Sequence, residues 1–257
     1  MIVLRDTWYM LGRQLRNQAR EPIWIAIMLV QPMIWLVLYG QLFKNVTHLG
    51  GFGTTSYITF LAPAIVVMNA FFGASWSGLA TVFDIDRKFV ERVLATPASR
   101  LSLVLSQIVR SALVAAVQGA IILLVGLALG VRVHSGVLGW LVILLVATLV
   151  NTGFAGFSQG VALLVRREST VIALANFISL PLLFLSSTLL AEKQMPDWMR
   201  ILSNYNPVNW GVRAARDVVL PGTDWGSVGT HMGYLFVLSV VTAAFANWTF
   251  RIYKRSL

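Results

Sequence analysis

Cysteine is absent from this 257-residue sequence, and charged residues are scarce at 12% of the total. The lack of cysteine excludes disulfide bonds and thiolate metal sites. A soluble domain of this size has about 25% charged residues, whereas here 57% of the residues are hydrophobic. Uncharged apolar stretches also exceed the roughly 18 residues that indicate a membrane-spanning helix. The composition therefore predicts a polytopic membrane protein.

The sequence also lacks the motifs of several enzyme classes. Every lysine follows a residue other than glycine, so a GxxxxGK phosphate-binding loop is absent and the chain is not by itself a P-loop ATPase. The histidines His48, His134 and His231 lie far apart, in or beside expected outer loops, which argues against a metal cluster. No Ser-His-Asp arrangement has a local signature. We expect no catalytic residue, no metal ligand and no cofactor in this chain.

Residues 1–21 are predicted to form an amphipathic interfacial helix. At about 100° per residue, Leu4, Trp8 and Leu11 fall on one face and the arginines on the opposite one. Arginine on the polar face and tryptophan on the apolar face suit a helix that lies on an anionic inner leaflet. The apolar run that follows is too long for the core of a signal peptide, so we expect no cleavable signal.

Residues 22–257 are predicted to form one domain of six transmembrane helices. The expected spans are about 22–43, 57–83, 103–131, 137–165, 169–190 and 229–250. Lysine and arginine concentrate in the segments assigned to the inner side, so the positive-inside rule predicts cytoplasmic termini. We attribute the formal net charge of +10 to this orientation rather than to binding of nucleic acid. The fold class expected is an all-α integral membrane protein.

Two segments between the spans are expected to have special roles. The loop 84–100 is densely charged, and each charge at the centre of a bilayer costs at least about 2.5–3.5 kcal/mol. This loop must therefore face water, either as a solvated connector or as a docking helix for a partner. The outer segment 192–225 mixes charges with aromatic and aliphatic residues and is punctuated by proline. That mixture predicts short interfacial or re-entrant helices.

The spans contain polar residues but little charge. No Asp, Glu or Lys lies at mid-depth, and Arg110 is the one charge within a predicted span, whereas ion-coupled carriers usually need such groups. The polar residues near mid-membrane that we consider for a substrate path are Asn69, Ser75, Asn151, Gln159, Asn176 and Ser179. They either line that path or bond between helices, at about 0.6 kcal/mol each. Spans without an evident energy source favour a partner that supplies energy.

Two stretches resemble type-2 ABC exporter permeases. The loop sequence DRKFVERVLATPASR is similar to the family's cytoplasmic loop, in which an acidic-basic pair precedes a Leu-x-Thr-Pro run. The outer sequence MPDWMRILSNYNPVNWGVRAAR is similar to the family's outer stretch. The matching outer residues are Pro196, Trp198, Asn206, Pro207 and Arg213. The resemblance covers nearly the whole chain and is strongest to the daunorubicin-resistance and nodulation type, with O-antigen and teichoic acid permeases of similar architecture. One departure is Ser187, where the family often has glycine.

The resemblance implies the permease subunit of an exporter that binds no ATP itself. Two copies of the chain would form the pathway, with the first and fifth spans meeting across the two-fold axis. Two separate ABC ATPase subunits would hold ATP and Mg. The coupling residues would be Arg87, Val90, Glu91, Arg92, Val93, Leu94, Thr96 and Pro97. The cargo would be a hydrophobic drug or a lipid-linked saccharide, moved outward across the cytoplasmic (inner) membrane of a bacterium. A secondary carrier and a non-transporting membrane scaffold are the alternatives.

Overall fold

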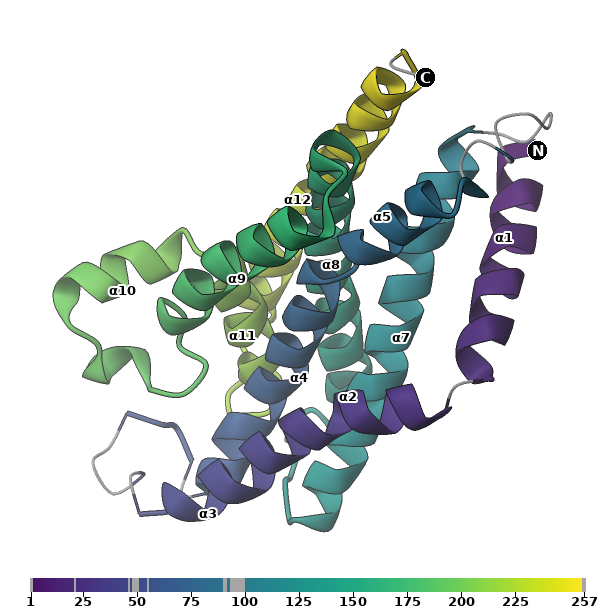
Figure 1. Ribbon diagram of the computed structural model, residues 1–257. Helices are drawn as coiled ribbons and strands as arrows, with labels where there is room; N and C mark the ends of the chain where they lie inside the picture. The colour runs from purple at the N-terminus through teal and green to yellow at the C-terminus, as the bar shows by residue number, and fades with distance from the viewer. Residues whose placement is uncertain are drawn as a thin grey trace.

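The structure is a computed structural model that describes residues 2–20, 22–45, 47, 51–54, 56–89, 92 and 100–255. These residues form helices joined by short connections, and no strand occurs among them (Figure 1). The α-helices are α1 (Ile2–Ala19), α2 (Pro22–Ile34), α3 (Gly40–Leu42), α4 (Tyr57–Ser75), α5 (Gly78–Asp86), α7 (Arg100–Ala128), α8 (Gly136–Val165), α9 (Glu168–Phe184), α10 (Asp197–Asn204), α11 (Pro207–Asp217) and α12 (Trp225–Arg255). The predicted all-α fold class is confirmed.

Four helical segments of the described chain are long and apolar enough to cross a membrane. They are Tyr57–Asp86, Ser102–Ala128, Gly136–Val165 and Trp225–Arg255. Two shorter apolar helices, Ile27–Leu42 and Glu168–Phe184, lie where the first and fifth spans were expected. The chain is therefore a multi-pass membrane protein. The division into six spans and the domain boundary at residue 22 stay predictions.

The ends of the chain lie together. Figure 1 shows α1 beginning and α12 ending at the same end of the molecule, as an even number of crossings requires. We call this the inner end and the opposite one the outer end, in keeping with the predicted topology. Which of the two faces the cytoplasm stays a prediction.

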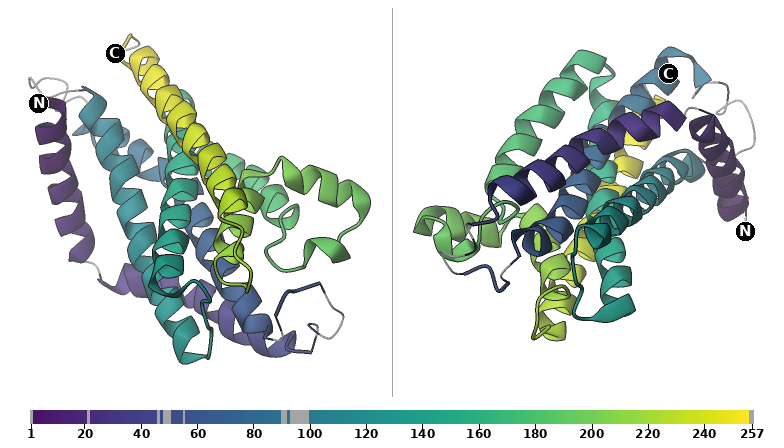
Figure 2. Two further views of the ribbon diagram at one scale, coloured as in Figure 1. Left: turned by 180° about the vertical axis from the view of Figure 1, so that it is seen from behind. Right: turned by 90° about the horizontal axis from the view of Figure 1, so that it is seen from below.

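Helix α4 is the centre of the fold. In its most apolar stretch 78% of the residues are buried, against 22% for α12. It packs against α7, α8 and α11, and the view from behind in Figure 2 shows α8 and α12 passing in front of it. Helix α12 packs along α8 and exposes aliphatic side chains such as Val237 and Val241, each 59% exposed. Such side chains suit a lipid-facing surface.

The helix of the first predicted span changes character after Pro32. Helix α2 ends at Ile34 and is followed by a π-helical segment, Trp35–Tyr39, and by α3. Proline cannot donate a backbone hydrogen bond and its ring clashes with the preceding turn, and π-helical turns are one of the known ways in which a helix adjusts to such irregularity. Gly40 follows at a close approach, where a Cβ atom would lie 2.6 Å from the side chain of Ile58.

Helix α1 runs beside the first turns of α7 in the same direction (Figure 1). Three hydrogen bonds join Met10 to Ser102, Gln14 to Ser106 and Gln18 to Arg110, each across 92 residues of sequence. The predicted apolar face is divided between two environments: Leu11 is 4% exposed, whereas Trp8 is 73% exposed. The amphipathic helix is thus present, and its attachment to a membrane surface stays a prediction.

Candidate functional site

The second predicted span is broken at Trp76 and Ser77. The backbone N–H groups of Ser77, Leu79 and Ala80 bond to carbonyls three residues earlier, instead of the four-residue spacing of an α-helix. This tight turn separates α4 from α5, and Figure 1 shows the change of direction between the two helices. The break is a candidate hinge between the buried span and the charged segment that follows α5.

Ser158 of α8 bridges the two sides of this hinge. Its hydroxyl donates to the carbonyl of Ser75 at 2.7 Å and accepts from the N–H of Gly78 at 3.0 Å. Buried backbone groups freed by a helix break need such partners. The approach leaves no room for a side chain at Gly78, where a Cβ atom would lie 2.5 Å from the Ser158 carbonyl oxygen.

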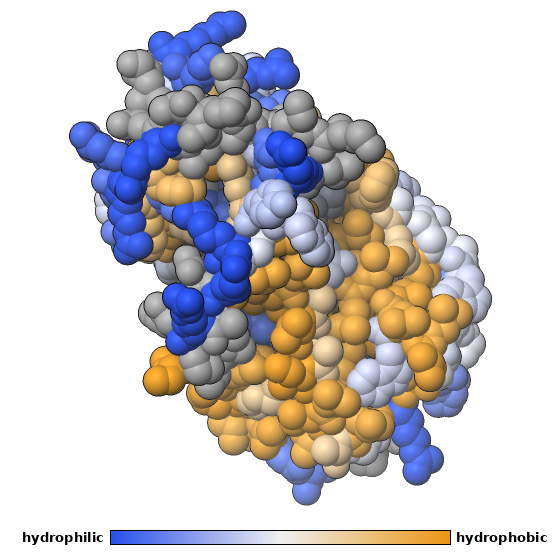
Figure 3. Space-filling view, turned by 90° about the vertical axis from the view of Figure 1, so that its right-hand side faces the viewer, coloured by the Kyte–Doolittle hydropathy of each residue, from blue (hydrophilic) through white to orange (hydrophobic). Residues whose placement is uncertain are grey.

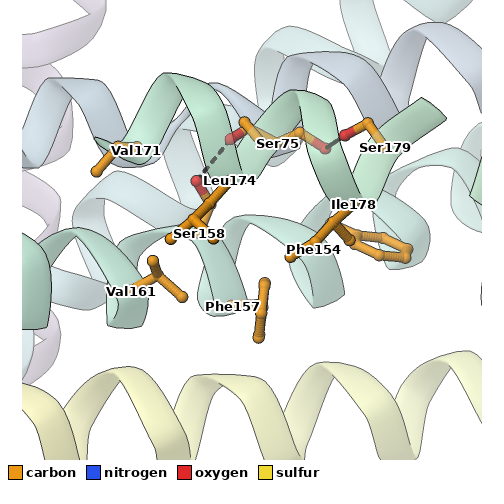
Figure 4. A pocket seen from close by; sticks show the side chains of 10 residues that line it. Ser75, Phe154, Phe157, Ser158, Val161, Val171, Leu174, Ile178 and Ser179 are labelled. Carbon is orange, nitrogen blue, oxygen red and sulfur yellow. Dashed lines mark hydrogen bonds between the residues drawn. The ribbon is translucent and has the colours of Figure 1, made fainter. Parts of the chain in front are cut away.

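A third serine brings α9 to the same point. The Ser179 hydroxyl donates to Ser75 Oγ at 2.9 Å, and Ser75 Oγ donates to the carbonyl of Phe71 at 3.0 Å. We call Ser75, Ser158 and Ser179 the serine clasp. Figure 4 shows these serines at a pocket of about 30 Å³, which is otherwise lined by apolar side chains such as Phe154 and Val171. Ser75 and Ser179, both predicted path residues, therefore meet, and sequence reasoning missed Ser158 between them.

The other predicted path residues lie apart from the clasp. Asn69 donates to Gln118 Oε1 at 3.0 Å, which joins α4 to α7. Asn151 donates to the Ala70 carbonyl at 2.9 Å, which joins α8 to α4. Gln159 lines a separate cavity of about 20 Å³, and Asn176 is exposed on α9. Asn69 and Asn151 thus form hydrogen bonds between helices, and the four residues do not line up as a continuous polar row. Their role in a substrate path stays a prediction.

Two side-chain atoms among the described buried residues of α8 have no hydrogen-bond partner. They are Asn151 Oδ1 and Gln159 Nε2. An unpartnered buried polar atom costs about 1–3 kcal/mol, so natural proteins rarely retain one without a reason. The cavity beside Gln159 is also lined by Thr81 and Asp84, and it is large enough for one water molecule by the usual measure of about 10–15 Å³. The cavity thus places Gln159 of α8 near two polar residues of α5, Thr81 and Asp84.

The segment after α5 turns back on itself. Lys88 has a left-handed backbone with φ of 53°, and the Arg92 guanidinium donates to the carbonyls of Arg87 at 2.9 Å and Lys88 at 3.3 Å. Arg87 and Arg92 are exposed. The remaining predicted coupling residues lie outside the described part of the chain. They are Val90, Glu91, Val93, Leu94, Thr96 and Pro97.

At the outer end, Glu192 joins the connection after α9 to α11. It accepts from Arg213 Nη2 at 2.7 Å, from Arg213 Nε, and from Asn209 at 3.3 Å. Burial by itself would raise the pKa of Glu192, but the hydrogen bonds and positive charge of Arg213 outweigh it and hold the pKa below its usual value. Arg213 also donates to Asn204 at the end of α10 at 2.7 Å.

The predicted outer helices are α10 and α11, and the motif residues lie at their ends. Pro196 precedes α10, and Trp198 is 59% exposed on it. Asn206 caps α11 by accepting from the N–H of Val208 at 2.9 Å, and its amide donates to the Leu182 carbonyl at 2.6 Å. Pro207 occupies the first turn of α11, where its missing N–H has no helical acceptor in any case.

Sequence reasoning did not single out Arg216 of α11. Its side chain is 7% exposed and its guanidinium lies 3.5 Å from the centre of the Phe60 ring. It donates to the carbonyl of Ser187 at 2.9 Å and to its hydroxyl at 3.2 Å. Ser187 Oγ in turn donates to Asn209 at 2.6 Å. The serine at the expected glycine position therefore ties the connection after α9 to α11.

We call Ser187, Glu192, Asn209, Arg213 and Arg216 the outer network. The sequence signal that would have marked Arg216 is its position on α11 among small and aliphatic residues, since its neighbours Ala214, Ala215, Val218 and Val219 are all fully buried. A cation placed on such a face must be buried and hydrogen-bonded. The network joins the connection after α9 to α11, and Arg216 attaches it to Phe60 of α4.

Comparison with known proteins gives a consistent result. The family model described as ABC-2 type transporter matches residues 5–220. The chain is 30% identical to the putative transport permease ycf38 of Porphyra purpurea, over 80% of this chain and 70% of that protein. It is 23% identical to the daunorubicin resistance ABC transporter permease protein DrrB1 of Streptomyces coeruleorubidus, over 91% and 80%. It is 28% identical to nodulation protein J of Bradyrhizobium diazoefficiens, over 79% and 81%.

Proposed function

The chain belongs to the ABC-2 type transporter family, and we propose that it is the permease subunit of an ATP-driven exporter. Permeases of this family are transport components rather than catalysts, and they generally work with an ABC ATPase subunit. In our proposal two such ATPase subunits hold ATP and Mg beneath two copies of this chain. The direction of transport is outward, across a bacterial inner membrane with both termini in the cytoplasm.

The single observation that best supports an energy-coupled permease is the hinge between α4 and α5. Helix α5 has nine residues and is therefore about 13 Å long at about 1.5 Å per residue. One of its ends meets the serine clasp, and its other end contains the first three residues of the charged segment 84–100. A push on that segment by a partner would move α5 as a lever against α8 and α9, with which it is in contact. The lever would then change the position of α4 in the core.

The proposed cargo is a hydrophobic or lipid-linked compound. The relatives' names refer to daunorubicin resistance and to nodulation, so they do not point to one shared cargo. The described spans offer hydroxyls and amides rather than carboxylates at mid-depth, which suits an uncharged or amphiphilic compound more than an ion. Within the class, the particular compound requires a substrate screen.

The second copy is proposed to cover α9. Asn176 is exposed on this helix, beside Phe177 at 77% and Phe184 at 63% exposure. An amide that faces lipid has no hydrogen-bond partner there, so a protein surface is the better neighbour. Because the chain has no cysteine, cysteine pairs introduced in α9 and α2 report cross-linking without background. Failure of every such pair to cross-link in membranes would exclude this seam.

The experiment that tests the function is purification of the tagged chain from its native membranes. We expect a co-purifying protein with a GxxxxGK[ST] motif, and vanadate-sensitive ATP hydrolysis by the complex. A homo-oligomer without any ATPase would overturn the proposal. It would favour instead the secondary carrier or the non-transporting membrane scaffold.

A sharper form of the test concerns Val93 and Leu94, which we propose as the apolar contact with the ATPase because exposed charges alone add little affinity. Val93→Asp with Leu94→Asp should abolish the association while the chain remains folded and inserted. Retained association in detergent would contradict this assignment of the coupling residues, even if the ATPase itself had been found.

A further inference from the structure

A second feature of the inner end is a cleft of about 920 Å³ between α1, α2, α5 and α7. Four arginines line it, one on α1, two in the segment after α5 and one on α7, together with a single carboxylate. These residues are Arg13, Arg87, Arg92, Arg110 and Asp84. Figure 3, which looks onto the side where α1 lies, shows hydrophilic residues gathered at the inner end above a broad hydrophobic surface. The lining is therefore strongly basic.

Part of the lining of the cleft is apolar. It is formed by Met28 of α2 and by residues at and after the hinge, among them Trp76, Leu79 and Phe83. Trp76 is 38% exposed and Phe83 is 41% exposed, so both present ring surface to the cleft. A cavity with a cationic side and an apolar side matches an amphiphile better than it matches a small polar anion.

The position of the cleft relative to the bilayer also suits an amphiphile. From Arg110 to the end of α7 at Ala128 the helix rises about 27 Å at about 1.5 Å per residue. This distance is close to the roughly 30 Å thickness of the hydrocarbon core of a bilayer. Arg110 therefore lies near the inner boundary of the hydrocarbon, at the depth where lipid phosphates begin. Trp76 lies at a similar distance from the outer start of α4.

Hydrogen bonds hold several polar groups of the cleft in place. Arg110 donates to Gln18 at 3.1 Å, and Gln107 donates to Asp84 at 2.8 Å. The Arg13 guanidinium lies 3.9 Å from the centre of the Phe89 ring. None of the four arginines forms an ion pair within the described residues. The buried Gln14 Oε1 also has no hydrogen-bond partner there, and Gln14 is one of the residues that line the cleft.

We propose that this cleft binds an anionic phospholipid. Guanidinium groups bind phosphate oxygens with two parallel hydrogen bonds, and Arg13 and Arg110 offer such groups from two different helices. Gln14 Oε1 would accept from a hydroxyl of the head group, and an acyl chain would lie along Trp76 and Phe83. Asp84, which accepts a hydrogen bond from Gln107, interacts electrostatically with Arg13, Arg110 and Arg87 and balances part of their positive charge. The inference goes beyond the proposed function, because lipid binding here does not require an ATPase or a cargo.

The experiment uses the full chain in nanodiscs of phosphatidylcholine that contain a minor fraction of phosphatidylglycerol, and native mass spectrometry counts the lipids retained after release. We expect the protein to retain phosphatidylglycerol in preference to phosphatidylcholine. Arg13→Gln with Arg110→Gln should lower the retained phosphatidylglycerol at least about tenfold, which corresponds to about 1.4 kcal/mol of binding free energy. The matched control, Arg132→Gln with Arg200→Gln, removes the same charge from exposed outer positions and should leave retention unchanged.

Three results would overturn the proposal. The first two are an equal loss of phosphatidylglycerol from the control variant and unchanged retention of phosphatidylglycerol by the cleft variant. The third is full displacement of the lipid by millimolar inorganic phosphate, because the apolar lining would then contribute nothing to binding. If the double variant fails to fold, Arg13→Gln alone, at an exposed position, should still lower retention several-fold. Phe83→Ser tests the apolar lining separately and should weaken retention without changing the preference for the anionic head group.

Discussion

The two ends of the molecule use arginine in opposite ways. In the outer network, Arg213 is paired with Glu192 and Arg216 is surrounded by carbonyls and a ring. In the inner cleft, four arginines line an open space and none is paired with a carboxylate within the described residues. Paired and buried charges hold segments in one arrangement, whereas unpaired charges at a cleft leave the segment ready for another molecule. We infer that the outer end is the fixed part of this permease and the inner end is the responsive one.

The largest effect that this comparison predicts comes from Arg216. Replacement by Met keeps most of the volume but leaves the carbonyls of Phe60 and Ser187 without their donor. We expect a loss of about 3 kcal/mol or more in the free energy of unfolding, because several buried acceptors lose partners at once. Thermal unfolding of the purified protein in detergent measures it. Arg200→Met removes an exposed pair with Asp197 and should cost less than about 1 kcal/mol; equal losses would contradict a fixed outer end.

Gly78→Ala tests the hinge from the steric side. The added Cβ atom would meet the Ser158 carbonyl oxygen at 2.5 Å, and the resulting overpacking should cost about 1–3 kcal/mol and displace α5 from α8. Gly73→Ala is the matched control on α4, where the nearest atom, Asn151 Nδ2, lies 3.9 Å away. This control should be neutral or slightly stabilising by helix propensity, by up to about 1 kcal/mol.

The functional measurement for the same pair is ATP hydrolysis and transport by the reconstituted complex. Gly78→Ala should retain the ATPase and hydrolyse ATP but lose transport, because the lever no longer transmits its movement. Normal transport in Gly78→Ala, or an equal loss in Gly73→Ala, would show that the hinge is only a packing feature.

Ser158→Ala addresses the clasp by removing hydrogen bonds without adding volume. The substitution removes the acceptor of the Gly78 N–H and the donor to the Ser75 carbonyl. We expect the free energy of unfolding to fall by about 1–2 kcal/mol. Thr148→Ala on the same helix removes a hydroxyl that bonds only to the Leu145 carbonyl of its own turn, so it should cost much less. Chemical denaturation in mixed micelles compares the two variants, and a difference below about 0.5 kcal/mol would argue against the clasp.

The sequence predicted the helices more completely than the contacts. Apolar periodicity and length are local properties, so the four long spans and the amphipathic first helix followed from them directly. The helices of the outer segment followed from another local property, its mixture of charged and hydrophobic residues punctuated by proline. The serine clasp depends on which face of α8 meets α4, and a lone Ser158 between Gly156 and Gly160 carries no local sign of that. Gly156 and Gly160 themselves pack closely against Thr242 and Phe245 of α12. Arg216 was missed for a related reason: its charge suggested an exposed loop, and only the buried neighbours on α11 reveal its true surroundings.

The smallest predicted effect concerns the pH dependence of the outer network. The pKa of Glu192 in the folded protein lies below the usual 4.5, so the unfolded chain binds this proton more readily than the folded one. The stability that Glu192 contributes is therefore fully present above pH 4.5 and is lost as the pH falls through the lower, folded-state value. Glu192→Gln cannot titrate and should lose this contribution at every pH. Its unfolding temperature should thus lie below that of the parent at pH 7, and the two should converge as the solution is acidified. The contrary result is a difference in unfolding temperature between parent and variant that stays constant down to pH 3, about one unit below the usual carboxyl range. It would mean that the pairing of Glu192 with Arg213 does not stabilise the outer end. The contrast between the two ends would then rest on Arg216 alone.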